Sequence, residues 1–469
     1  MGRAEIRMFQ RASETAAAFL KSHLTGDSRV KVVTHTDPDG IAAGAIMAKC
    51  LYSYNVPFHM TFTRPMKSAE IAELGKENYD LFVFLDQGSG QIAAIHKFVL
   101  GAGHDVLILD HHLGEFPELS NLVYFNPHAC GLNGATDVGA AGVVYSVVEH
   151  VGTEFRSLAG LAVVGAIGDR QEFFSGFTGV NEILVKRAVD LGLIRVSEGL
   201  KLMGRELSPV VECLRWCIRP YLPNLSGNPA ACRALVDTLG IAPGATLAEL
   251  GPDEEKKVRD AIFMRVDQVA TDENFCHTLW GTIYESTNKI TGPRDIREYA
   301  AMLNACGKLR KPEIGFAAAL GDRVAYNEAL GLLRRYQEQM VRVLGWFNKN
   351  MNLFKVTPQV RYIYAGKEVE PTMIGEALSL AMESGLVATD MPVIGMADAE
   401  DDELKISARA TLGLVMHGLN LGDTLTKVAA DVGGDGGGHD VSAAARIQRE
   451  RMDEFMTKLN KALAEAGGA

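Results

Sequence analysis

The sequence lacks a hydrophobic run long enough to cross a membrane. The longest apolar stretch, around Leu158 to Gly168, falls far short of the ~20 residues that span a bilayer. The N-terminus is charged and has no apolar core, so we expect no signal peptide. These absences predict a soluble, cytoplasmic protein with no membrane partner.

Paired cysteines are also lacking. The seven cysteines are scattered and odd in number, which suits a reducing compartment better than a disulfide framework. Cys213 and Cys217 have the spacing of neighbours on one helix face, but a second pair that would complete a zinc site is missing. The cysteines therefore point to no metal or redox function.

Positive charge is in deficit as well. The formal net charge is −11, which at first argues against a nucleic-acid partner. Clustered metal-binding aspartates count as negative in this sum, although bound cations would reverse the local field. Net charge alone therefore excludes neither nucleic acid nor a small substrate.

Short apolar runs alternate with helical patterns in the first part of the chain. Strands are predicted over Val30–His35, Leu81–Asp86, Val106–Asp110 and Leu122–Asn126. Their continuous rather than alternating apolarity is typical of strands covered on both faces, as in a parallel α/β sheet. The longer apolar run that follows predicts a buried helix ending near Asp169.

The chain then changes character twice. Residues 194–355 show helical patterns broken by proline and glycine, and they close with an amphipathic helix from about Asp322 to Asn348. From residue 356 a second α/β pattern leads through the glycine-rich loop VGGDGGGHD into a helical tail that begins at Val441. We therefore expect an α/β protein in three parts, with boundaries at 1–193, 194–355 and 356–469.

Acidic and histidine side chains follow three of the predicted strands and the buried helix. In chain order they are His35, Asp37, Asp39, Asp86, Asp110, His111, His112 and Asp169. A single aspartate at such a place is usually a turn or cap residue, but repeated placement after three strands is hard to produce by capping alone. In open parallel sheets, sites gather at the carboxyl ends of strands, so these side chains are expected to converge.

The chemistry of this set favours divalent ions. Carboxylates and imidazoles without a nearby thiolate favour Mn²⁺ or Mg²⁺ over structural zinc, and the number of ligands exceeds what one catalytic ion needs. Two ions bridged by a carboxylate can bind a phosphoryl oxygen and generate hydroxide from water at neutral pH. The pattern predicts phosphoester hydrolysis.

The motifs HTDPDG, LDQGSG, LDHHLG and AIGD, in this order, resemble the four motifs of the DHH phosphoesterase superfamily. The glycine loop GGDGGGHD resembles the substrate-binding signature of the DHH-associated C-terminal domain. The chain is most similar to archaeal RecJ-like exonucleases, one branch of which associates with the GINS complex. The resemblance implies an N-terminal parallel-sheet catalytic domain, a helical insert and a C-terminal α/β domain, with a cleft between the two α/β domains.

The resemblance also implies a role for each residue of the cluster. Five residues would hold two divalent ions, with Mn²⁺ preferred to Mg²⁺. One ion would be held by His35 and Asp37, and the other by Asp39, His111 and Asp169. Asp86 would bridge the two ions, Asp110 would orient a histidine ligand, and His112 would face the scissile phosphate.

In the C-terminal domain the resemblance implies a nucleotide-binding site. Gly436, Gly437 and Gly438 have no side chains, so their backbone N–H groups would approach a phosphate closely. Arg409 and His439 would supply charge-assisted contacts to it.

Two further segments have open interpretations. His128 could approach the metal cluster, whereas the small residues Gly139–Gly142 would let a helix start pack tightly. Arg446, Arg449 and Arg451 would either extend a basic surface along the C-terminal helix or form a solvated helix face.

Three functions stay open. The leading hypothesis is a two-metal exonuclease that degrades single-stranded DNA or RNA in DNA replication or repair. The second keeps this chemistry on oligonucleotides of a few residues, adenosine 3′,5′-bisphosphate or cyclic dinucleotides. The third is a replisome scaffold without catalysis, against which the intact motifs argue. The helical insert is a candidate docking surface for a GINS-like or other replication protein.

Overall fold

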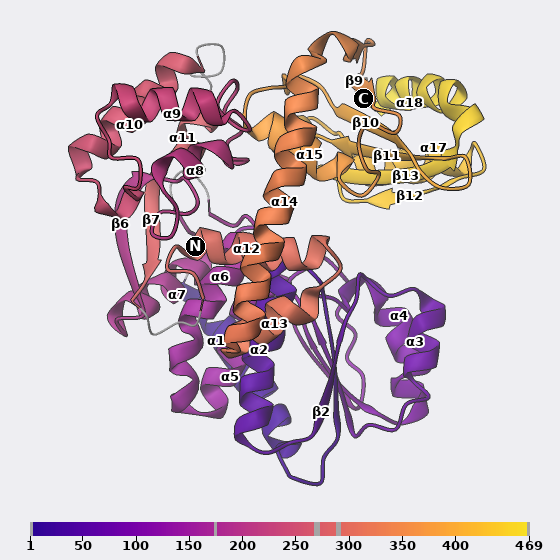
Figure 1. The fold of residues 1–469 in the computed structure, drawn as a ribbon. Helices are drawn as coiled ribbons and strands as arrows, with labels where there is room; N and C mark the ends of the chain where they lie inside the picture. The colour runs from indigo at the N-terminus through magenta and orange to yellow at the C-terminus, as the bar shows by residue number, and fades with distance from the viewer. Residues whose placement is uncertain (1–2, 173–175, 267–272, 288–291, 467–469) are drawn as a thin grey trace. The chain divides into compact units, whose positions relative to one another are not determined.

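The apolar runs of the N-terminal region form a five-stranded parallel sheet in the computed structural model, which describes residues 3–172, 176–266, 273–287 and 292–466. The strand order is β2-β1-β3-β4-β5 (Figure 1). The strands are β1 Val30–Thr34, β2 Phe58–Phe62, β3 Leu81–Leu85, β4 Asp105–Leu109 and β5 Leu122–Phe125. Every residue of β1 and β3 is buried, as expected for strands covered on both faces. Only β2 is not predicted, because its sequence FHMTF mixes polar residues with apolar ones at the sheet edge.

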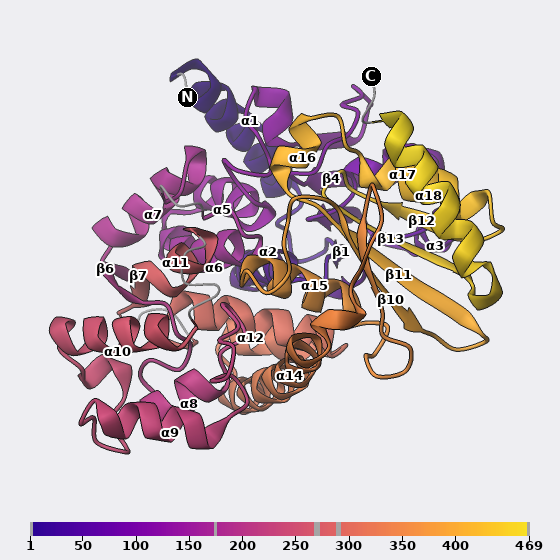
Figure 2. The same ribbon diagram turned by 90° about the horizontal axis from the view of Figure 1, so that it is seen from above.

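Helices cover both faces of this sheet. Leu74 of α3 and Ile95 of α4 join Phe82 and Phe84 of the sheet in one apolar cluster. Helices α2, α5 and α6 contact one another on the opposite side, as Figures 1 and 2 both show. The helices of this part are α1 Arg3–Ser22, α2 Pro38–Ser53, α3 Ser68–Leu74, α4 Ile92–Phe98, α5 Ala140–Val151, α6 Ala159–Gly168 and α7 Gly179–Asp190. Helix α6 confirms the predicted buried helix, and Asp169 is its C-cap.

The region between the two α/β patterns is mostly helical. Its helices are α8 Val210–Arg215, α9 Pro229–Thr238, α10 Pro252–Arg265, α11 Glu273–Leu279, α12 Ile296–Lys308, α13 Pro312–Leu320 and α14 Arg323–Lys349. It also contains a two-stranded sheet of β6 Ile194–Leu200 and β7 Trp280–Ser286, which the helical prediction misses. Helix α14 confirms the predicted long amphipathic helix.

Residue contacts divide the chain into two units. The first comprises Met1–Glu198 and Thr282–Tyr336, and the second comprises Gly199–Gly281 and Gln337–Ala469. The boundaries therefore fall inside β6, β7 and α14. The division of the chain into three consecutive parts stays a prediction.

The C-terminal part of the second unit contains a six-stranded mixed sheet of order β12-β13-β11-β10-β9-β8. Its strands are β8 Lys355–Val356, β9 Arg361–Tyr364, β10 Val393–Asp398, β11 Glu403–Arg409, β12 Asp435–Gly438 and β13 Ser442–Gln448. Strands β9 and β10 are parallel, and the other pairs are antiparallel. The helices are α15 Ile374–Glu383, α16 Leu412–Met416, α17 Leu421–Ala430 and α18 Met452–Ala466.

Two predictions for this part are wrong. The glycine-rich loop forms the edge strand β12, and Ser442–Gln448, expected to begin the helical tail, forms β13. The sequence SAAARIQ contains strong helix formers, but pairing with both β11 and β12 overrides that local propensity. Arg446 therefore lies on a strand, where it pairs with Glu403, and not on a helix.

Two expected absences can be compared with the structure. In the described ranges, no helix is both long enough and apolar enough to cross a membrane. Each of the seven cysteines is free, and six of them are buried.

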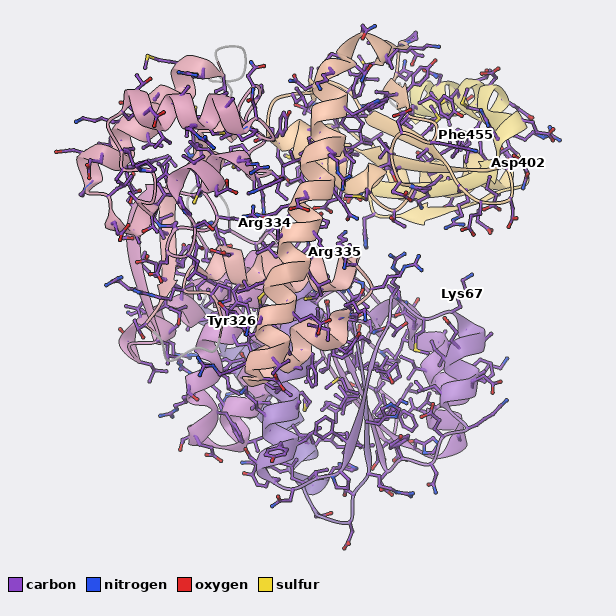
Figure 3. The ribbon with its side chains drawn as sticks, viewed as in Figure 1. Lys67, Tyr326, Arg334, Arg335, Asp402 and Phe455 are labelled. Carbon is purple, nitrogen blue, oxygen red and sulfur yellow. The ribbon has the colours of Figure 1, made fainter. Side chains whose placement is uncertain are left out.

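The second unit depends on the packing of α18 onto its sheet. Phe455 of α18, labelled in Figure 3, is fully buried in the apolar cluster that includes Ile406 and Leu425. We predict that Phe455→Ala lowers the free energy of unfolding by about 3–5 kcal/mol, because it leaves a cavity. Calorimetric unfolding would measure this loss of stability. Met416 is 86% exposed, so Met416→Ala is the control and should leave stability unchanged. An unchanged melting temperature for Phe455→Ala would contradict the described packing.

Candidate metal centre

The first motif lies where β1 ends and α2 begins. Asp37 is the N-cap of α2, and its Oδ1 accepts a hydrogen bond of 2.9 Å from the backbone N–H of Gly40. Its Oδ2 lies 3.1 Å from Nδ1 of His35, which is also 3.4 Å from Oδ2 of Asp86. Asp37 therefore caps a helix with one oxygen and faces the cluster with the other.

Asp39 is completely buried under the start of α5. Its two oxygens accept hydrogen bonds of 2.6 and 2.9 Å from the N–H groups of Ala140 and Ala141. A Cβ on Gly139 would lie 2.6 Å from Oδ2 of Asp39, and a Cβ on Gly165 of α6 would collide with Oδ1. The small residues thus let two helices close around this carboxylate, in agreement with the tight packing expected at Gly139–Gly142.

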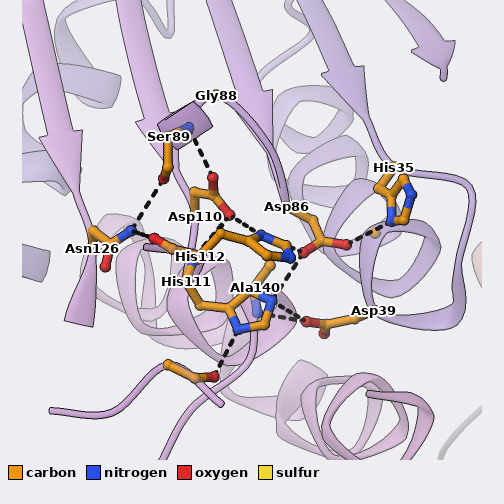
Figure 4. A network of polar contacts seen from close by, with 12 residues as sticks. His35, Asp39, Asp86, Gly88, Ser89, Asp110, His111, His112, Asn126 and Ala140 are labelled. Atoms are coloured by element: carbon orange, nitrogen blue, oxygen red, sulfur yellow. Dashed lines mark hydrogen bonds and ion pairs between the residues drawn. The ribbon is translucent and has the colours of Figure 1, made fainter. Parts of the chain in front are cut away.

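Asp86 lies at the centre of the cluster. Its Oδ1 is 3.1 Å from Nε2 of His111, and its Oδ2 faces His35 (Figure 4). Oδ2 is buried and has no hydrogen-bond partner among the described residues, a costly arrangement that a cation would relieve. Asp86 also has a φ of 56°, in the left-handed region that non-glycine residues rarely adopt.

Asp110 holds both histidines of the third motif. Its Oδ1 accepts hydrogen bonds of 2.8 Å from the backbone N–H of His111 and 2.8 Å from Nδ1 of His112. Its Oδ2 accepts a bond of 3.0 Å from the N–H of Ser89. This fully buried carboxylate therefore orients its neighbours instead of facing outward.

A second network fixes the ring of His111. Its Nδ1 lies 2.7 Å from the carbonyl oxygen of Gly134, which can only accept, so Nδ1 carries a proton and Nε2 faces the carboxylates. The buried amide of Gln171 donates to the same carbonyl and to Oδ2 of Asp169, both at 2.7 Å. Asn181 in turn donates to Gln171 at 2.6 Å. Gln171 therefore links the carboxylate of Asp169 to the histidine.

Three residues that support the site were not singled out from the sequence: Gln171, Asn126 and Ser89. Asn126 donates to Ser89 at 3.2 Å and to the carbonyl oxygen of His112 at 2.9 Å. The available signals are weak: Gln171 stands two residues after the fourth motif, and Asn126 ends a predicted strand. His128 supports the site indirectly, since its Nε2 accepts from the N–H of Gly134 and it belongs to no ligand group among the described residues.

The structure brings all eight predicted residues of the N-terminal motifs together. They form three groups, and within each group the ligand atoms all lie within 4.8 Å of one another. The groups are His35, Asp37 and Asp86; Asp39, His111 and Asp169; and Asp86, Asp110, His111 and His112. Asp86 and His111 each belong to two of these groups. Carboxylate and imidazole donors around an oxygen without a partner fit Mn²⁺ or Mg²⁺.

Crowding of buried carboxylates shifts the pKa values of the cluster. Burial disfavours the charged imidazole of His35, but the carboxylates of Asp37 and Asp86 outweigh it and raise the pKa to about 11. Burial raises the pKa of Asp169 to about 6, with a further contribution from Asp37 and Asp86. Burial and the same kind of repulsion raise the pKa of Asp39. The metal-free cluster therefore retains protons that a cation would displace.

The predicted phosphate-binding residues lie together in the second unit. Strand pairing aligns Arg409 with Ser442 and Gly438 with Ala443, so Arg409 and the turn at His439 lie at one end of the sheet. The Nε of Arg409 donates to Oγ of Ser379 at 2.8 Å, which directs the guanidinium across α15.

The three glycines of β12 differ in what they allow. A Cβ on Gly436 would lie 2.5 Å from the carbonyl oxygen of Leu425 in α17, and Gly438 has a φ of 145°. A Cβ on Gly437 would meet nothing within 4 Å. The fold requires glycine at Gly436 and Gly438, whereas the missing side chain of Gly437 leaves open space.

Comparison with known proteins gives consistent results. The sequence matches the DHH family, N-terminal domain, over residues 29–166 and the DHHA1 domain over residues 358–465. An uncharacterised protein of Methanocaldococcus jannaschii is 31% identical over 442 residues, which cover 93% of each chain.

Solved structures share the fold at low identity. RecJ in complex with Mn²⁺ from Thermus thermophilus is 17% identical with a TM-score of 0.58; the match covers 97% of this chain but 55% of that one, so this chain spans about half its length. CDC45 from Entamoeba histolytica is 13% identical with a TM-score of 0.66, and the match covers 96% and 99% of the two chains. At these identities the likeness concerns the fold alone.

The glycines of β12 generate a stability prediction. We expect Gly436→Ala to destabilise the second unit by about 1–3 kcal/mol, because the new methyl group overpacks the contact with α17. Gly437→Ala should leave the melting temperature unchanged, because the methyl group would project into open space. Thermal unfolding of both variants measures the difference, and equal losses would contradict the described β12–α17 packing.

The raised pKa values predict that metal binding releases protons. A ligand histidine must be neutral and a ligand carboxylate ionised, so Mn²⁺ affinity should rise with pH through the pKa of about 6 of Asp169 and beyond. Titration calorimetry in two buffers of different ionisation enthalpy, near neutral pH, would report the released protons. Identical binding heats in both buffers would contradict this account.

Proposed function

Because the chain belongs to the DHH superfamily and is RecJ-like, we propose that it is a metal-dependent phosphodiesterase that shortens single-stranded DNA or RNA from an end. The family and fold support a phosphoesterase. The observation that carries the finer proposal is the convergence of all four motifs on the buried carboxylate of Asp86.

We assign two divalent ions to the cluster, with Mn²⁺ preferred to Mg²⁺. His35 and Asp37 would hold the first ion, and Asp86 would bridge it to the second. The second would also be held by Asp39, His111 and Asp169. When bound, such ions polarise a phosphoryl oxygen and lower the pKa of coordinated water.

The protein's own contribution is orientation and a donated proton. Burial disfavours the charged form of His112, but its hydrogen bond to Asp110 outweighs this and raises the pKa, which favours the protonated imidazolium. The side chain of His112 is 39% exposed, more than Asp37, Asp169 or His35. We therefore assign its Nε2 as a donor to the scissile phosphate.

We assign nucleotide binding to the end of the second sheet at which Arg409 and His439 lie. Arg409 is positively charged, and the strand Gly436, Gly437 and Gly438 lies at the sheet edge beside the turn at His439. The open space at Gly437 leaves room for a ligand to approach the backbone. This assignment rests on the motif resemblance and on that shared position.

A replication scaffold is the second candidate, since the chain and CDC45 from Entamoeba histolytica share a fold over nearly their whole lengths. In that role the predicted helical insert, residues 194–355, would be the docking surface for a GINS-like partner. Scaffolding does not require the ligand groups that this chain retains, so we rank it below catalysis.

A time course with Mn²⁺ on strands labelled at the 5′ or 3′ end, as DNA and as RNA, tests the proposal. Stepwise shortening from one end would support an exonuclease and give its polarity and sugar preference. Release of mononucleotides from dinucleotides alone would favour a small-substrate phosphodiesterase. Absence of hydrolysis in either form would favour the scaffold.

The bridging assignment predicts the effect of Asp86→Asn. This change should lower kcat/KM by about 10³-fold or more, equivalent to about 4 kcal/mol, because both ions lose a charged ligand. The exposed Asp27→Asn is the matched control and should retain full activity. Substantial turnover by Asp86→Asn in excess Mn²⁺ would count against a bridging carboxylate.

A further inference from the structure

Two exposed basic segments of the first unit flank the first metal motif. The loop after β2 carries Arg64 and Lys67. The last residue of α12, Lys308, and the turn that follows it, with Arg310 and Lys311, form the second segment, which is called the α12–α13 turn below. Figure 3 shows the side chain of Lys67 projecting from the start of α3. These five residues are called the cationic edge below.

The α12–α13 turn packs directly on the motif. A Cβ on Gly307, the residue before Lys308, would collide with the carbonyl oxygen of Thr36. Thr36 stands between the predicted ligands His35 and Asp37. The absence of a side chain at Gly307 therefore lets the basic turn lie against the backbone of the metal cluster.

The β2 loop reaches the motif from the other side. Strand β2 pairs with β1 with Phe62 opposite Thr34, and the N–H of Thr63 donates to the carbonyl oxygen of Thr34 at 2.9 Å. The ring of Phe62 lies 5.3 Å from the ring of Phe316 in α13. This contact joins β2 to α13, the elements next to the two basic segments, so both segments lie beside the carboxyl end of β1.

Local structure does not account for these cations. Lys67 is the N-cap of α3, where the helix dipole disfavours positive charge. Arg310 has a φ of 59°, at a position after a helix where glycine is the usual residue. Within the described ranges, the side chains of Arg64, Lys67, Arg310 and Lys311 form no ion pair. Four unneutralised cations at one edge contrast with a net charge of −11 for the whole chain.

We propose that the cationic edge binds backbone phosphates of the single strand that flank the scissile one. This proposal rests on the proposed function and adds to it a binding surface for the strand on the first unit. Arg and Lys fit this ligand because their charge pairs with phosphate whatever the base sequence. A long strand would gain from the edge, whereas a dinucleotide would end before reaching it.

Binding of a fluorescent strand to the full chain tests the proposal without hydrolysis. Anisotropy would be measured in EDTA over a range of salt concentrations, with a strand of about 20 nucleotides. Lys308→Gln/Arg310→Gly/Lys311→Gln removes the turn's charges, and glycine suits the left-handed backbone at 310. Arg64→Gln/Lys67→Gln removes those of the β2 loop. The control, Lys21→Gln/Lys97→Gln/Lys186→Gln, removes three charges elsewhere in the same unit.

We expect the turn variant to weaken binding about tenfold near physiological salt and to reduce the salt slope by about 0.7 for each lost phosphate contact. The loop variant should show a smaller change of the same kind, and the control should bind as the wild type does. Wild-type affinity in the turn variant, an equal loss in the control, or no binding by the wild type would each overturn the proposal.

A second measurement separates this proposal from the proposed function. With Mn²⁺ present, the turn variant should lose kcat/KM on long strands and keep it within about twofold on dinucleotides, because the lost contacts lie beyond the reacting phosphate. Equal losses on both substrates would contradict a role outside the reaction centre. If the wild type hydrolyses neither substrate, the nuclease proposal fails, while anisotropy still decides whether the edge binds a strand.

Discussion

The structure of the first unit depends on accommodating several carboxylates in one buried space. Burial and mutual repulsion both favour the neutral acid, as the raised pKa values of Asp39 and Asp169 indicate. The fold opposes this with backbone N–H donors. Those at the start of α5 reach Asp39, one in the first turn of α2 reaches Asp37, and three reach Asp110. Among the described carboxylates of the cluster, Asp86 keeps a buried oxygen, Oδ2, that has no hydrogen-bond partner, and a cation there would relieve this cost.

Helix placement follows from this requirement. A helix start can donate to a carboxylate only if its backbone comes close, and Gly139 and Gly165 allow that approach around Asp39. The amide of Gln171 then ties the loop at Gly134 to the end of α6. The chemistry of the cluster and the packing of the helices are therefore one problem, since a shift of Asp37, Asp39 or Asp169 would also shift a helix end.

Much of the first unit could be predicted because its signals are local. Four of the five strands read as apolar runs, and ligand-type residues stand directly at the ends of three of them. Strands β12 and β13 could not be predicted, because glycine and alanine form strands there only through pairing: β12 pairs with β13, and β13 also pairs with the earlier strand β11. The importance of Gln171 and Gly307 was equally hidden, since each contacts a partner that only the folded chain brings near.

The first unit is assembled from two separate pieces of the chain. Residues Thr282–Tyr336 return to it after the chain has passed through the second unit, and Gly307 then packs on the backbone of Thr36. A ribosome would therefore finish all four motifs well before the helix that covers the first of them emerges. The first motif is therefore covered only late in synthesis, and a fragment that stops after the fourth motif would leave Thr36 uncovered.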